Sequence, residues 1–156
     1  MISEVKRTLS FIFLPNPSGE LIPSGTAFFV AVNDEKHTDR AYVYLVTAKH
    51  VLQTNRTNYY DRILVRLNRK DGGSDLVSVP LTGTNNAPPI FTHADKNVDL
   101  AVIPLAPDGT KYDVRWIPDS MLVTKETFDR LRIKEGDDVF FGGLFIPFPG
   151  AKKTSR

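Results

Sequence analysis

Short apolar stretches, separated by clusters of turn-forming residues, recur along the first two thirds of the chain. In the clearest of them, residues 62–67, charged and aliphatic side chains alternate with the period of two that a strand buried on one face requires. Runs of this kind, bounded by turn residues, are typical of an all-β protein. Six strands are predicted, which is enough for one closed antiparallel β-barrel. They cover residues 5–14, 21–32, 41–47, 62–67, 76–81 and 100–105.

The pattern changes after residue 110. Residues 124–132 have the composition of a short helix, and Thr124 is a suitable N-cap because its side-chain oxygen can accept from a free backbone N–H. Residues 139–144, which include two adjacent glycines, predict one further strand.

The composition favours a globular protein and limits its partners. Of the 156 residues 41% are apolar, and 20 basic residues against 18 acidic ones leave a net charge of +2, so we expect no nucleic-acid partner. The chain has no cysteine, so disulfides and thiolate metal sites are excluded. The apolar run at residues 9–14 falls short of the roughly 7–15 residues of a signal sequence, and nothing approaches the about 20 residues of a membrane span. We therefore expect a cytoplasmic location without membrane association.

Two residues with catalytic side chains stand at the ends of predicted strands. His50 follows the strand at residues 41–47, and Asp99 opens the aliphatic strand at residues 100–105. Their separation of 49 positions leaves room for the strands that would bring both to one rim of a barrel. Taken singly, the histidine also fits a surface position and the aspartate a cap or turn. His37, His50 and His93 have no metal-binding spacing, so we expect neither a metal nor a cofactor.

Four segments resemble motifs of the trypsin-like (chymotrypsin-fold) serine proteases, bacterial type. Residues 46–51, Val-Thr-Ala-Lys-His-Val, resemble that family's Thr-Ala-Ala-His segment, and residues 99–102, Asp-Leu-Ala-Val, its Asp-Ile-Ala-Leu segment. Residues 25–30, Gly-Thr-Ala-Phe-Phe-Val, are similar to the strand that precedes the histidine in many bacterial members. Residues 136–143 are similar to the strand that opens the second barrel of the family. The order, histidine before aspartate, is also that of the family.

The resemblance implies a fold and a role for each residue. Residues 1–110 are expected to form the first, six-stranded Greek-key β-barrel. Residues 111–156 are expected to hold the inter-barrel connector, a short helix and the first strand of an incomplete second barrel. His50 would act as general base and then general acid, and Asp99 would orient it.

The third catalytic residue is missing from the sequence. None of the eight serines lies in a Gly-x-Ser-Gly or Gly-x-Ser-x-Gly motif. The resemblance therefore implies the N-terminal portion of a serine endopeptidase. This portion is expected to be inactive alone, because the nucleophile and the oxyanion hole are absent. A polypeptide substrate would bind only once a second barrel completes the protein. The alternative is a non-catalytic pseudoprotease or β-barrel protein-binding module, which could associate through the phenylalanine-rich edge from Phe140 to Phe148.

Overall fold

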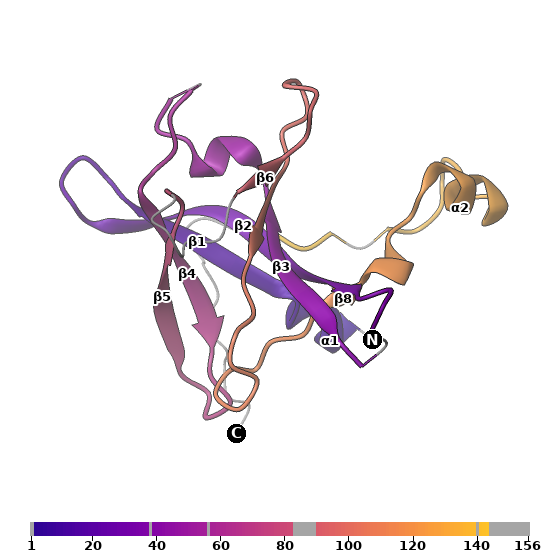
Figure 1. Ribbon diagram of the computed structural model, residues 1–156, viewed down its shortest axis with the longest axis horizontal. Helices are drawn as coiled ribbons and strands as arrows, with labels where there is room; N and C mark the ends of the chain where they lie inside the picture. The colour runs from indigo at the N-terminus through magenta and orange to yellow at the C-terminus, as the bar shows by residue number, and fades with distance from the viewer. Residues whose placement is uncertain (1, 38, 56, 83–89, 140, 144–156) are drawn as a thin grey trace.

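The structure is a computed structural model that describes residues 2–37, 39–55, 57–82, 90–139 and 141–143. Within this part of the chain, eight strands form one sheet and the helices are short (Figure 1). The strands are β1 (Leu9–Pro15), β2 (Leu21–Asn33), β3 (Ala41–Thr47), β4 (Arg62–Asn68), β5 (Ser74–Pro80), β6 (Phe91–Thr92), β7 (Ala101–Pro104) and β8 (Ile117–Pro118). The helices are α1 (Ile2–Lys6), α2 (Lys125–Arg130) and the 3₁₀ turns η1 (Lys49–Leu52) and η2 (Asp119–Met121).

The strands follow the order β5-β4-β1-β2-β3-β7-β6, and every neighbouring pair on this path is antiparallel. β8 adds two residues to β2 in the parallel sense. Alternate residues of β1, β4 and β7 are buried, because successive side chains of a strand point to opposite faces.

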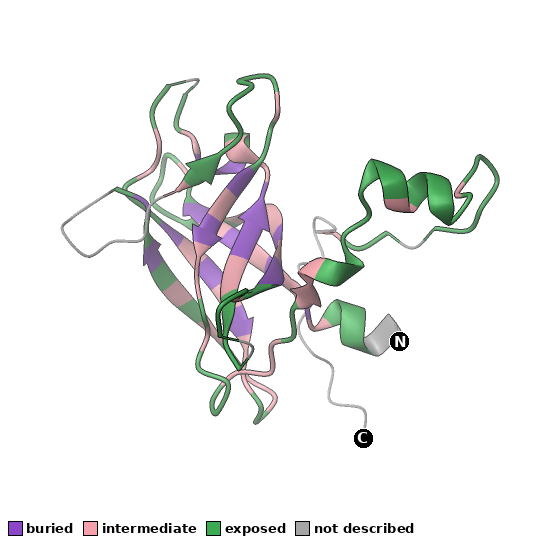
Figure 2. Ribbon diagram, turned by 45° about the vertical axis from the view of Figure 1, so that its right-hand side comes forward, coloured by how far each residue is buried: buried purple, intermediate pink, exposed green. Residues whose placement is uncertain are grey.

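One apolar core holds the two ends of the sheet together. It contains Val79 from β5 and Ile103 from β7, together with Phe29 and Leu45 from the strands between. Since residues from distant strands share this core, the twisted sheet curls around it, and the buried positions lie on its inner face (Figure 2).

The predicted antiparallel β-rich fold is confirmed, and the six predicted strands correspond to β1–β5 and β7. The first strand begins later than predicted, because the chain turns at residues 4–8. There the Thr8 hydroxyl and backbone N–H both donate to the Val5 carbonyl, and α1 forms where a strand was expected. The two-residue strands β6 and β8 were not predicted, since two residues have no period that can be recognised.

Two further predictions have a different outcome. The closed Greek-key barrel is not confirmed, because the described residues contain no pairing that joins β5 to β6 or β7. The strand predicted over residues 139–144 is not observed at Val139 or at residues 141–143, and Phe140 and residues 144–156 lie outside the described residues. The predicted Phe140 to Phe148 edge therefore falls largely outside the described part of the chain.

The short helix predicted over residues 124–132 is confirmed as α2. α2 begins after Thr124, whose side-chain oxygen accepts from the Thr127 N–H as an N-cap should. Every helix that the structure describes is too short or too polar to cross a bilayer. The division into two parts at residue 110 and the cytoplasmic location remain predictions.

Candidate functional site

The register between β3 and β7 brings His50 and Asp99 to one edge of the sheet. Thr47, at the end of β3, is paired with Ala101, at the start of β7. Because the two strands are antiparallel, the residues that follow Thr47 and those that precede Ala101 leave the sheet at the same edge. η1 and the loop before β7 both lie there (Figure 1).

η1 is anchored in the core by its buried side chains. Val51 and Leu52 are buried, and the Val51 N–H donates to the Ala48 carbonyl, which closes the turn. Gly25 of β2 lies against Val51, so closely that a Cβ on Gly25 would stand 2.5 Å from Val51 Cγ1. The glycine thus permits a close approach of η1 to β2, and this approach helps to position His50 relative to the sheet.

Asp99 contacts His50 with both carboxylate oxygens. Oδ2 lies 2.5 Å from Nδ1 of the imidazole, and Oδ1 accepts the backbone N–H of His50 at 2.9 Å. Two contacts to one residue fix both the position and the rotation of the ring relative to the carboxylate. With Nδ1 facing a carboxylate, the proton of a neutral imidazole is held on Nδ1 and the lone pair on Nε2.

The same contacts change the ionisation of Asp99. The hydrogen bond with the His50 side chain, and then the one from its backbone N–H, lowers the pKa of the Asp99 carboxyl below its usual value. The charges of His50 and Lys49 act in the same direction, while partial burial opposes them. Asp99 is therefore an anion at neutral pH and can stabilise a positive charge on the imidazole.

The other side of the imidazole is accessible. The His50 side chain is 72% exposed, and its Nε2 atom has no hydrogen-bond partner among the residues that the structure describes. A neutral imidazole with a free Nε2 can accept a proton from a hydroxyl group or from water.

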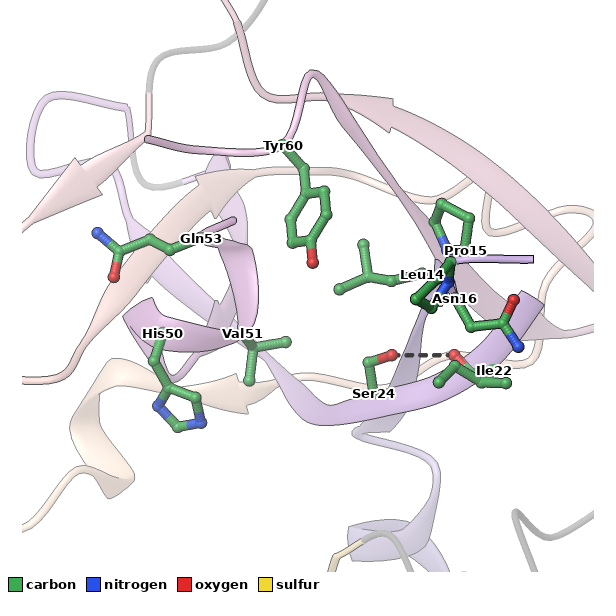
Figure 3. A pocket seen from close by; sticks show the side chains of 10 residues that line it. Leu14, Pro15, Asn16, Ile22, Ser24, His50, Val51, Gln53 and Tyr60 are labelled. Carbon is green, nitrogen blue, oxygen red and sulfur yellow. Dashed lines mark hydrogen bonds between the residues drawn. The ribbon is translucent and has the colours of Figure 1, made fainter. Parts of the chain in front are cut away.

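An open depression of about 340 Å³ borders His50 (Figure 3). The side chains of Leu14, Val51 and Tyr60 gather in it, and the imidazole lies at its rim. The complete lining comprises Leu14, Pro15, Asn16, Pro17, Ile22, Ser24, His50, Val51, Gln53 and Tyr60. The hollow thus combines apolar side chains with a few polar groups at its edge.

Ser24 is the only serine in this lining, and its hydroxyl is otherwise engaged. Its Oγ donates to the Ile22 carbonyl at 3.0 Å, as Figure 3 shows, and makes no hydrogen bond with His50. The described part of the chain thus brings two of the three expected catalytic groups together, His50 and Asp99.

Sequence reasoning missed one contributor to this edge. Lys49 comes directly before His50, where many members of the family that the chain resembles have alanine. Lys49 is partly buried, and its ammonium group donates to the backbone carbonyls of Lys96, at 2.9 Å, and Val98, at 3.1 Å. A lysine next to a candidate base is a weak signal, because its partners here are backbone atoms with no side-chain signature.

In the described residues, no three His, Asp or Glu side chains lie close enough together to hold a metal ion.

The chain matches no known protein-family model, no curated protein and no solved structure. What the site can do is therefore argued from its own geometry.

Proposed function

We propose that this chain is the part of a trypsin-like serine endopeptidase that carries the general base and its orienting carboxylate. The observation that carries the proposal is the His50–Asp99 pair, with Nδ1 at 2.5 Å from the carboxylate and Nε2 accessible. This is the arrangement that a Ser-His-Asp mechanism requires of these two residues.

The proposed chemistry follows from the pair. Nε2 of His50 takes the proton of a serine hydroxyl as the oxygen attacks the carbonyl carbon of a peptide bond. Asp99 stabilises the imidazolium, which then gives the proton to the leaving amine as the peptide C–N bond breaks. Serine and oxyanion hole come from a second β-barrel. Without them this part alone does not hydrolyse peptides.

The strand order supports the fold that goes with this function. β4 returns to lie beside β1, so four strands follow the order β4-β1-β2-β3 that defines a Greek key. Since β5 and β7 contribute to the same core, we propose that they form the seam of a six-stranded barrel.

The substrate class follows from the surface beside the base. The depression around Leu14, Val51 and Tyr60 can hold an apolar side chain of a polypeptide while His50 faces the bond to be cleaved. We propose that the substrate is an extended polypeptide.

The proposal is tested on the full-length gene product, with casein as substrate and a fluorophosphonate probe that labels activated serines. Asp99→Asn should lower kcat about 10⁴-fold, because the imidazole is then held in the wrong tautomer. His50→Ala should lower kcat about 10⁶-fold, because the serine loses its base.

The β2–β3 loop supplies a matched control. There Nδ1 of His37 lies 3.0 Å from Asp34 Oδ2, which makes a second histidine–aspartate pair away from the proposed site. His37→Ala and Asp34→Asn should leave the rate unchanged. A full-length protein that neither hydrolyses casein nor reacts with the probe would contradict the protease function.

A second function, that of a non-catalytic protein-binding module, is favoured by one surface. Several large apolar side chains that follow β8 are exposed, among them Met121 at 69%, Val139 at 85% and Phe141 at 86%. Many residues after β8 are exposed (Figure 2), and exposed apolar side chains can take part in association. Loss of both probe labelling and hydrolysis, with retained partner binding, would favour this alternative.

A further inference from the structure

The ammonium group of Lys49 joins the two segments that carry the proposed catalytic pair. Lys49 belongs to η1, directly before His50, and its side chain reaches the loop that ends at Asp99. It donates to the carbonyls of Lys96 and Val98, three residues and one residue before Asp99. These are charge-assisted hydrogen bonds, which are stronger than those between neutral groups.

The loop is arranged to present these carbonyls. Asp95 organises a turn in which its side-chain Oδ1 accepts the Asn97 N–H and its carbonyl accepts the Val98 N–H. Among the described residues, the hydrogen bonds that join the loop to η1 come from Lys49 and from Asp99 itself.

We propose that Lys49 is a positioning residue, which fixes the Asp99 loop against η1 so that the carboxylate meets Nδ1 of His50. This inference rests on the proposed function, because a positioned pair matters only if His50 acts as a base. Because Lys49 donates to backbone carbonyls, its contact with the loop does not depend on the side chains at positions 96 and 98.

The His50–Asp99 pair needs a positioning residue because both side chains are exposed. The Asp99 side chain is 48% exposed and His50 is 72% exposed, so water competes with the hydrogen bond between them. An additional tether outside the pair reduces the conformations that the loop can adopt, and thus the entropy lost when the carboxylate meets the ring. Lys49 supplies this tether without touching the reacting atoms.

The test uses proton NMR of the whole chain. An imidazole N–H that is hydrogen-bonded to a carboxylate gives a strongly downfield resonance, and its loss in His50→Ala assigns it. Lys49→Met keeps the stem but removes the donors, so this resonance should be lost. Lys49→Arg, which keeps cation and donors, should restore it. Lys96→Met is the matched control, because Lys96 contributes its carbonyl and not its side chain, and the resonance should persist.

A second measurement needs no substitution. In the unmodified chain, the ammonium protons of Lys49 should exchange with water more slowly than those of Lys96. The inference is overturned if the resonance persists in Lys49→Met, or if the ammonium protons of both lysines exchange equally fast. The pair itself, and with it the proposed function, is contradicted if the unmodified chain gives no downfield resonance. Failure of the inference and failure of the function are therefore distinguishable.

Discussion

The hydrogen bonds that hold the Asp99 carboxylate favour its ionised form. They lower its pKa in the folded chain below the value in the unfolded chain. The folded carboxylate therefore contributes stability above the unfolded-state pKa, and this contribution is lost as the pH falls through the lower folded-state pKa. Because the side chain is half exposed, solvent screening keeps the contribution small.

This gives a prediction for Asp99→Asn. At pH 7 the substitution should lower the free energy of unfolding by less than about 1 kcal/mol, and the difference from the unmodified chain should disappear in strong acid. Urea unfolding at a series of pH values measures both. A difference that grows toward acid pH would contradict the lowered pKa of Asp99.

Gly25 gives a prediction about packing beneath the site. A methyl group at this position would stand 2.5 Å from Val51 Cγ1, and the buried Val51 has little room to move away. Gly25→Ala should therefore cost about 1–3 kcal/mol of stability and displace η1 together with His50. Adding Val51→Ala should relieve the overlap. Gly109→Ala, where no atom lies within 4 Å of the new Cβ, is the control.

At the scale of elements, α2 depends on its N-cap for stability. No residue of this helix is buried, so packing contributes little and the Thr124 side chain is its main local support. Thr124→Ala should cost about 0.5–2 kcal/mol of helix stability. Backbone chemical shifts of residues 125–130 should move toward random-coil values, whereas the unfolding midpoint of the sheet should stay the same. Thr124→Ser keeps the oxygen and should leave the helix intact.

Elements with a strong period could be predicted from the sequence, and elements set by tertiary contacts could not. The alternation at residues 62–67 identified β4, and Thr124 identified the start of α2. The pairing of β4 with β1 places Phe11 opposite Arg66, 55 positions later in the chain, and no local pattern announces it. The proximity of His50 and Asp99 was expected from their order and spacing, but the clamp by Lys49 depends on the shape of a loop.

At the scale of the whole molecule, the core couples the two ends of the sheet to the site. Ile103 lies on β7, is fully buried, and shares the core with residues of β5 as well as with Val51 and Leu52 of η1. Asp99 stands just before the same strand. A cavity at Ile103 therefore weakens the sheet and the segment that carries the carboxylate together.

Ile103→Val should lower the free energy of unfolding by about 0.5–1.5 kcal/mol, because one buried methylene group is removed and the core only partly refills the space. Leu100→Val is the matched control: Leu100 is 41% exposed and lies next to Asp99, so a substitution there should stay within about 0.5 kcal/mol. Urea denaturation followed by both tryptophan fluorescence and circular dichroism measures the two variants. If the sheet curls around one core, the two probes should report a single transition for Ile103→Val. Separate transitions would mean that the region around Trp116, directly before β8, unfolds apart from the rest of the sheet.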